Sequence, residues 1–317
     1  MRVMRLADSG HGVELEEAIA PRPEPGPAEL LIRICAAGVT PTELLWYPTS
    51  HNKNGTKRDN AVPGHEFSGV IASAGEAATE FSVGESVYGM NDWFADGAMA
   101  EFCLSTPSSL ARKPSCLTHV EAASVPIGAL TAWQGLFDRA KLKSGERILV
   151  HGGAGAVGVF AVQLAHYAGA HVIATASASN LEFVASLGAE QVLDYRASHF
   201  EQVLSDIDVV FDTVGGETLQ RSWGVLKPSG RMITIAAGEE NATDERIKGA
   251  FFLVQPNQKQ LEEIANLLDS QTIIPVIDAV VPFRSAADAY KKNVRSRLGR
   301  GKLVVDLDSN VEEKAAL

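Results

Sequence analysis

From residue 119 onward the chain alternates short apolar runs of strand length with longer stretches of helical length. Strands separated by helices of this size predict right-handed βαβ units and a parallel sheet that is covered by helices on both faces. The strand runs are almost wholly apolar, as expected where both faces of a strand are buried. We expect strands at 147–151, 170–175, 191–193, 207–211 and 231–236, helices at 120–123 and 131–140, and a candidate sixth strand at 251–254.

Residues 1 to about 118 show a different pattern, in which glycine and proline interrupt short runs of alternating apolar and polar residues. This pattern is typical of an irregular β-rich domain. The segment 21–27 is rich in proline and lies between strand-like sequences, so we interpret it as a stiff connection between two strands. We expect strands at the N-terminus and at 29–36, 68–73, 86–89 and 98–104.

The last part of the chain is interpreted as returning to the β-rich domain. The predicted fold class is therefore α/β, with a Rossmann-type doubly wound domain (122–255) inserted between two parts (1–121 and 256–317) of the β-rich domain. The length of 317 residues suits two domains, and a cleft between them is a favoured place for a pocket. We expect 309–317 to be a frayed polar end. Beyond residue 256 we expect helices and strands in alternation, at 259–268, 276–281, 286–293 and 302–306.

The most informative segment is 147–165, where a strand, a glycine turn and a helix follow one another. Gly153, Gly155 and Gly158 match the G-x-G-x-x-G pattern of dinucleotide-binding turns, and the N-terminus of the helix would face the pyrophosphate. The alternative is a plain glycine turn between a strand and a helix. We expect the dinucleotide to contact the residues of this turn, namely Gly153, Ala154, Gly155, Ala156 and Val157.

The loop after the second strand of the parallel sheet indicates which dinucleotide is bound. In NAD-binding proteins an Asp or Glu about 20 residues past the glycines binds the ribose 2′-hydroxyl. Here no carboxylate occurs before Glu182, so the loop has room for a 2′-phosphate and does not repel it. This favours NADPH over NADH. The candidate neighbours of the 2′-phosphate each offer a hydroxyl group: Ser177, Ser179 and Tyr195. The alternative is that these residues only form a turn.

Composition excludes several classes of protein. The chain is 45% hydrophobic and 21% charged, and its net charge of −11 without any basic run argues against a nucleic-acid partner. No apolar stretch approaches the roughly 18 residues of a membrane span, and the N-terminus lacks the apolar core of a secretory signal. Cys35, Cys103 and Cys116 form neither a C-x-x-C pair nor a disulfide framework, so we expect a reducing, cytoplasmic location.

Six segments carry a resemblance to a known family. They read GHEFSGV (64–70), GAMAEF (97–102), PIGALTAW (126–133), VHGGAGAVG (150–158), FDTVG (211–215) and GKLVVD (301–306). Together they resemble the medium-chain dehydrogenase/reductase superfamily and look most like its zinc-independent quinone oxidoreductase branch, which includes zeta-crystallin-like proteins. The resemblance implies a chaperonin-10-like (GroES-like) catalytic domain, a Rossmann domain and a homodimer built through the Rossmann sheets.

In the zinc alcohol dehydrogenases of this superfamily, the counterpart of His65 is a ligand of the catalytic zinc. The expected thiolate partners are missing, because Thr40 stands at the position of the first Cys and no Cys lies near the third ligand position. The region 89–101 also lacks the cysteines of the structural zinc site. A catalytic zinc normally has three protein ligands. We therefore expect no bound metal, and we interpret His65 and Glu66 as structural or cleft-lining residues.

Without zinc, the oxidation of an alcohol lacks its Lewis acid. A quinone or an α,β-unsaturated carbonyl accepts hydride through its own conjugation, so the protein has chiefly to position the reactants and exclude water. The resemblance places Thr40, Trp46 and Tyr47 beside the nicotinamide and the substrate. Thr40 is a candidate donor to an oxyanion or a ribose hydroxyl, and Tyr47 is a candidate proton donor. The alternatives are a hydroxyl that closes a turn and a tyrosine that only packs.

The resemblance also implies contacts to the nicotinamide half of the cofactor. They come from the start of the helix before the glycine turn, from the ends of sheet strands and from a segment that closes over the ring: Thr131, Val214, Ala236, Phe251, Phe252 and Leu253. Adjacent aromatic residues are more often part of a core, so we expect only one of the two phenylalanines to touch the cofactor.

Three functions stay open on the sequence. The first is an NADPH-dependent, zinc-free reductase of quinones or α,β-unsaturated carbonyls. The second is a zinc-type alcohol dehydrogenase with atypical ligands, and the third is a non-catalytic NADPH-binding sensor. The loop 51–60 is interpreted either as a mobile lid or as a solvent-exposed turn.

Overall fold

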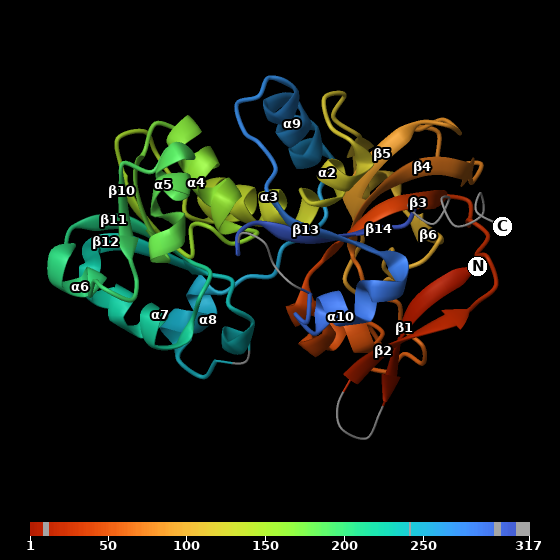
Figure 1. The fold of residues 1–317 in the computed structure, drawn as a ribbon, viewed down its shortest axis with the longest axis horizontal. Coiled ribbons are helices and arrows are strands. Elements are labelled where there is room, and N and C mark those ends of the chain that lie inside the picture. Colours follow the sequence, from red (N-terminus) through yellow and green to blue (C-terminus); the bar gives the residue numbers. More distant parts are fainter. Residues whose placement is uncertain (9–12, 241, 295–298, 309–317) are drawn as a thin grey trace.

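The computed structural model describes residues 1–8, 13–240, 242–294 and 299–308, so the expected frayed end at 309–317 lies outside the described residues. Residues 30–112 and residues 277–306 contribute strands to one seven-stranded sheet (Figure 1). Its order is β13-β14-β3-β4-β5-β7, and β6 also pairs with β3. The strands are β3 (Leu30–Val39), β4 (Glu66–Ala74), β5 (Ser86–Met90), β6 (Phe102–Ser105), β7 (Leu110–Arg112), β13 (Ile277–Pro282) and β14 (Lys302–Asp306).

A separate hairpin joins β1 (Arg2–Asp8) to β2 (Val13–Ile19), and the proline-rich segment connects β2 to β3 as expected. The C-terminal tail returns to the β-rich part because β14 pairs antiparallel with β3. The centre of this sheet is apolar on both faces, since nine of the ten residues of β3 are buried. This arrangement fits the expected GroES-like β-rich fold.

The middle of the chain forms a five-stranded parallel sheet in the order β10-β9-β8-β11-β12. The strands are β8 (Arg147–His151), β9 (His171–Ala176), β10 (Gln191–Asp194), β11 (Ile207–Asp212) and β12 (Leu226–Thr234). The candidate sixth strand at 251–254 is wrong, because Phe251 makes only an isolated bridge to Thr234. The carbonyl of Val254 accepts instead from the Trp93 indole at 2.8 Å, so this backbone leaves the sheet and binds the β-rich part.

The helix expected at 131–140 begins five residues earlier. Pro126 starts α3 (Pro126–Trp133), because a proline at the first helical position loses no hydrogen bond there. A π-helical segment, Gln134–Arg139, continues it. The helix expected at 286–293 ends early, as α10 (Ala286–Tyr290), and Lys292 beyond it has a positive φ of 55°.

The other described helices are α1 (Tyr47–Ser50), α2 (His119–Ala123), α4 (Gly158–Tyr167), α5 (Leu181–Ser186), α6 (Phe200–Val203), α7 (Gly216–Ser222), α8 (Glu245–Ala250) and α9 (Gln258–Asp269). All of them are short except α4 and α9. None of the described helices is long and apolar enough to cross a membrane.

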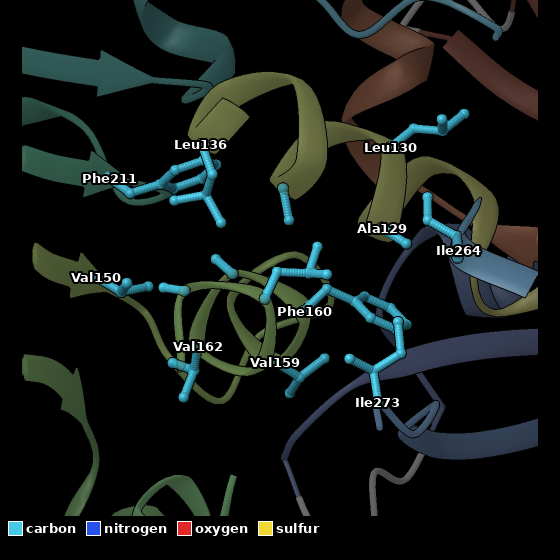
Figure 2. Packing of buried hydrophobic residues seen from close by; sticks show 14 of the residues in the cluster. Ala129, Leu130, Leu136, Val150, Val159, Phe160, Val162, Phe211, Ile264 and Ile273 are labelled. Carbon is cyan, nitrogen blue, oxygen red and sulfur yellow. The ribbon is translucent and has the colours of Figure 1, made fainter. Parts of the chain in front are cut away.

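One apolar cluster holds the two sheets together. Figure 2 shows Phe160 of α4 among side chains of α3, α9 and the segment after α9. The same cluster continues to Tyr88 and Trp93 of the β-rich part. Tyr88 Oη also donates to the carbonyl of Leu261 in α9 at 2.5 Å. Because a shared core crosses the expected domain boundaries near residues 121 and 255, these boundaries stay predictions.

Candidate active site and cofactor-binding site

The turn between β8 and α4 contains glycines with different steric roles. Gly152 has a φ of +73°, and a Cβ there would lie 2.4 Å from Thr213 Oγ1. A Cβ at Gly158 would lie 2.1 Å from the carbonyl oxygen of Gly152, so this glycine allows α4 to approach β8. Gly155 is exposed, and its nearest neighbour would be 3.3 Å from an added Cβ. The turn therefore presents an open backbone surface at Gly155.

The G-x-G-x-x-G pattern omits Gly152, the glycine that needs a left-handed backbone. The signal in the sequence is the Gly152-Gly153 doublet directly after a buried strand. Gly153 packs instead beneath the turn, where a Cβ would lie 3.1 Å from that of Ala174 and 3.0 Å from Val184. Ala154 is buried, whereas Ala156 and Val157 are partly exposed at the start of α4.

A cavity of about 460 Å³ lies over this turn, at the carboxyl ends of the parallel strands. Ligands of open α/β sheets bind at this edge. Of the predicted cofactor residues, the cavity brings together Ala154, Gly155, Ser177, Tyr195 and Val214. Asn180 and Gly299, which sequence reasoning missed, line it as well.

The loop after β9 is a cluster of hydroxyl and amide groups. Ser177 Oγ lies 3.2 Å from Ser179 Oγ and accepts a hydrogen bond of 3.2 Å from Asn180 Nδ2. Ser179 is exposed beside Ser177 rather than in the cavity wall. Tyr195 is exposed, and the guanidinium of Arg196 lies 5.3 Å from its ring centroid. The loop thus offers hydrogen-bond donors and no carboxylate.

The two residues directly before β14, Arg300 and Gly301, contact α5 and the glycine turn. The Gly301 amide donates to the Ala154 carbonyl at 2.8 Å, and Gly301 forms a bridge with Gly155. Arg300 stacks on Phe183 of α5, with its guanidinium carbon 4.0 Å from the ring centroid. Sequence reasoning missed Arg300, because its contact with α5 joins residues that are distant along the chain.

His151 is a buried residue at the end of β8, directly before the turn. Its Nδ1 lies 3.2 Å from Thr175 Oγ1 and its Nε2 lies 2.9 Å from Ser222 Oγ. Thr175 Oγ1 also accepts from the Gly152 amide at 3.2 Å. Burial, assisted by the positive charge of Arg221, lowers the pKa of His151 from 6.5 to about 4.

This pKa predicts a loss of stability in mild acid. Above pH 6.5 His151 is neutral in both states, whereas between pH 6.5 and about 4 only the unfolded chain takes up the proton. The free energy of unfolding should therefore fall across that window, by up to roughly 3 kcal/mol from this group. Urea unfolding of the protein and of His151→Asn at several pH values tests this. Equal pH slopes for the two proteins would contradict it.

Thr40 lies at the end of β3, in contact with two buried charged groups. Its Oγ1 accepts from Lys302 Nζ at 3.1 Å and donates to Glu66 Oε1 at 3.3 Å. Glu66 forms an ion pair with Lys302 and accepts from the Ile127 amide at 2.9 Å. Burial raises the pKa of Glu66, while Lys302 and the Ile127 amide act in the opposite direction.

Glu43 is the centre of a second buried cluster. It accepts from the amides of Gly64 and His65, at 3.1 and 3.3 Å, and from the Tyr290 hydroxyl. His65 Nδ1 lies 2.5 Å from Glu43 Oε2, and His65 Nε2 lies 3.2 Å from the Ala95 carbonyl oxygen. Both ring nitrogens of His65 therefore face oxygen atoms of the protein.

These residues do not fit a catalytic zinc ion. A zinc-bound histidine presents one nitrogen lone pair to the metal and commonly donates its other ring N–H to a carboxylate. The ring nitrogen of His65 that does not face Glu43, Nε2, lies instead 3.2 Å from the Ala95 carbonyl oxygen. Thr40 contributes a hydroxyl in place of a thiolate. In the described part of the chain, no group of three or more His, Cys, Asp or Glu side chains is arranged to hold a metal.

Tyr47 is the first residue of α1 and is half exposed, whereas the preceding Trp46 is buried. Tyr47 is 50% exposed and stacks on His51, with 4.1 Å between the ring centroids. Trp46 is buried edge-on against Trp93. Within the loop 51–60, the Arg58 side chain donates to the carbonyls of Thr49 and Ala95 and forms an ion pair with Asp96, which connects the loop to its neighbours.

The residues predicted around the nicotinamide half differ in exposure. Thr131 lies inside α3 rather than at its start, and its hydroxyl donates to the Ile127 carbonyl at 2.6 Å. Phe252 is a core residue, 4% exposed, and its ring lies against the guanidinium of Arg139. Three predicted residues are partly exposed: Ala236, two residues after the end of β12, Phe251, which is bridged to Thr234 at that end, and Leu253.

Comparison with known proteins gives two family matches. Residues 26–131 match the alcohol dehydrogenase GroES-like domain, and residues 187–305 match the zinc-binding dehydrogenase family. These matches cover parts of the β-rich region and of the parallel sheet with its return to β14.

Individual relatives match over most of the chain. A probable mitochondrial zinc-binding oxidoreductase of Arthroderma benhamiae is 32% identical, over 90% of this chain and 91% of its own. A 2-methylene-furan-3-one reductase of Solanum lycopersicum is 33% identical, over 87% of this chain and 71% of its own. The solved structure of a quinone oxidoreductase from Coxiella burnetii superposes with a TM-score of 0.84 at 27% identity, covering 97% of this chain and 99% of that chain. The chain belongs to the medium-chain dehydrogenase/reductase superfamily, among its quinone oxidoreductase-like members.

Proposed function

We propose that this protein is an NADPH-dependent reductase that transfers hydride to a quinone or an α,β-unsaturated carbonyl without a metal ion. Its family makes it an oxidoreductase with a nicotinamide cofactor. The observation that carries the rest of the proposal is that Thr40 and His65, which stand at positions of zinc ligands in the zinc alcohol dehydrogenases, are hydrogen-bonded to groups of the protein. With no Lewis acid to stabilise an alkoxide, an acceptor that delocalises charge by itself is the substrate class that suits the site.

The choice of NADPH rests on the loop after β9. Its hydroxyl and amide groups, from Ser177, Ser179 and Asn180, suit a 2′-phosphate, and no carboxylate repels that group. Arg300 adds a positive charge that is held against the start of α5 by Phe183. An arginine fork beside hydroxyl groups is a common recognition device for phosphate.

Within this proposal the bound nicotinamide supplies the hydride, and the chain supplies orientation and proton transfer. The open backbone at Gly155 receives the pyrophosphate, while Phe251 and Leu253 help to shield the nicotinamide half together with Thr131, Val214 and Ala236. Thr40 is the candidate donor to the substrate oxygen. Tyr47 is the candidate donor of the proton that completes the reduction.

The name of the tomato relative supports the substrate class, since a 2-methylene-furan-3-one contains a carbonyl conjugated to a carbon–carbon double bond. We propose a homodimer and a cytoplasmic location as well. In the homodimer, two parallel sheets would join through their edge strands β12. The cytoplasmic location agrees with the three cysteines, which are free.

A panel of acceptors tests the proposed function. The purified protein should oxidise NADPH in the presence of benzoquinone, menadione or 2-cyclohexen-1-one, and it should leave saturated ketones such as cyclohexanone unreduced. Tight binding of NADPH without oxidation by any acceptor would favour the sensor. Stoichiometric zinc whose removal abolishes activity would favour the alcohol dehydrogenase.

A further inference from the structure

Lys302 is a buried ammonium group whose role the proposed chemistry does not yet explain. Its side chain is 4% exposed, and Nζ pairs with Glu66 Oε1 and donates to Thr40 Oγ1 at 3.1 Å. The residue directly follows Gly301, which is hydrogen-bonded to the Ala154 carbonyl of the glycine turn. The backbone directly before Lys302 therefore contacts the glycine turn, and the ammonium group at the end of its side chain contacts Thr40.

The surrounding fold makes room for this ion pair. Gly38 on β3 leaves space for the Glu66 carboxylate, because a Cβ at this position would lie 2.6 Å from it. Glu66 is fully buried and its second oxygen accepts from the Ile127 amide near the N-terminus of α3. A buried charge is costly unless it is paired and hydrogen-bonded, and here both charges are.

The Thr40 hydroxyl has two possible directions. Its oxygen accepts from Lys302, while its hydrogen makes a long bond of 3.3 Å to Glu66. Thr40 is only partly buried, whereas the two charged side chains are closed off from solvent. If the hydroxyl turns toward a bound substrate, Glu66 keeps Lys302 and the Ile127 amide as partners. The turn therefore costs one weak hydrogen bond.

We propose that Lys302 is a positioning residue that polarises the Thr40 hydroxyl, and that this hydroxyl donates a hydrogen bond to the carbonyl oxygen of the substrate. This inference rests on the proposed function. The β-carbon of an enone accepts the hydride with its electron pair from NADPH, which is oxidised to NADP⁺. The electron pair of the carbon–carbon double bond moves toward the carbonyl, whose oxygen becomes an enolate, and the α-carbon later takes a proton from Tyr47 or water.

Because the Thr40 oxygen accepts a hydrogen bond from the Lys302 ammonium, its hydroxyl becomes a stronger donor. Hydrogen bonds in a chain polarise one another. The developing enolate oxygen therefore gains more from this hydroxyl than the neutral carbonyl does. Loss of a direct oxyanion donor typically lowers turnover by about 100- to 1,000-fold. We expect a somewhat smaller loss, about 10- to 100-fold, when the polarising charge alone is removed.

Removal of Lys302 alone would leave the Glu66 charge unpaired and threaten folding. The main variant is therefore Lys302→Met with Glu66→Gln, compared with Lys302→Arg, which keeps the charge. A matched control is Lys291→Met with Glu14→Gln, which removes an exposed pair of the same type. Single-turnover oxidation of NADPH by 2-cyclohexen-1-one should slow about 10- to 100-fold in the main variant only, with the Kd for NADPH little changed. An unchanged rate, or a loss that only follows weaker NADPH binding, would overturn the inference.

A binding measurement gives a second readout that does not depend on turnover. In the NADP⁺-loaded protein, 4-nitrophenolate mimics the enolate oxygen, and 4-nitrotoluene has a similar shape without the charge. The wild type should prefer the phenolate, Thr40→Val and the main variant should lose this preference, and Lys302→Arg should keep it. A wild type without the preference would refute the oxyanion site. A wild type that reduces no acceptor refutes the proposed function, whereas an active wild type whose main variant keeps both rate and preference refutes this inference alone.

Discussion

Gly158→Ala should lose both stability and cofactor binding. The added Cβ would lie 2.1 Å from the carbonyl oxygen of Gly152 and 2.9 Å from Gly153 Cα. These neighbours are backbone atoms, so no side-chain rotation relieves the clash, and α4 has to move away from β8. Overpacking of this kind costs about 1–3 kcal/mol or more. Thermal unfolding and titration with NADPH should show a lower Tm and no measurable binding.

Gly155→Ala is the matched control, because it adds the same methyl group three residues earlier. Its nearest neighbour would be the Gly152 carbonyl oxygen at 3.3 Å, and Gly155 is exposed. This variant should keep most of its stability, yet bind NADPH at least about 10-fold more weakly, since the methyl group occupies the surface that receives the pyrophosphate. Unchanged NADPH binding by Gly155→Ala would place the pyrophosphate elsewhere.

Arg300→Ala should change the choice between the two nicotinamide cofactors. A hydrogen bond to a charged group contributes about 1.5–3 kcal/mol, which corresponds to about 10- to 100-fold in affinity. We therefore expect the Kd for NADPH to rise by about that factor. The Kd for NADH should change little, because NADH lacks the 2′-phosphate. Fluorescence titration with both cofactors measures the two constants.

Two further variants control this prediction. Arg300→Lys keeps the positive charge and should retain part of the preference for NADPH. Arg246→Ala removes an exposed arginine that is paired with Asp244, and it should leave both constants unchanged. Equal weakening of NADPH and NADH by Arg300→Ala would mean that Arg300 only anchors the segment to Phe183.

The parallel sheet could be predicted because its strands are short apolar runs between helices. The turn at Gly153 to Gly158 was recognisable for the same reason, since it directly follows such a run. The predicted strand at 251–254 failed because its apolar residues serve another purpose. The Val254 backbone binds Trp93, and Phe252 enters the core beside Arg139.

The charged residues of the site were not predictable from local patterns. Lys302 and Arg300 follow each other closely in the sequence, yet they act on Thr40 and on α5, which lie far away along the chain. Hydrophobic periodicity records which face of an element is buried and carries no information on such long-range polar partners. Glu43 was missed for the same reason, because its partners His65 and Tyr290 come from distant segments.

Hydride transfer by metal-stripped protein tests the central claim most directly. The protein is dialysed against a chelator, its zinc content is measured, and it is mixed with NADPH and 2-cyclohexen-1-one in a stopped-flow instrument. We predict that NADPH absorbance decays at the same rate before and after stripping, with far less than one zinc per chain. Loss of the decay on stripping, and its return when zinc is added back, would contradict the account.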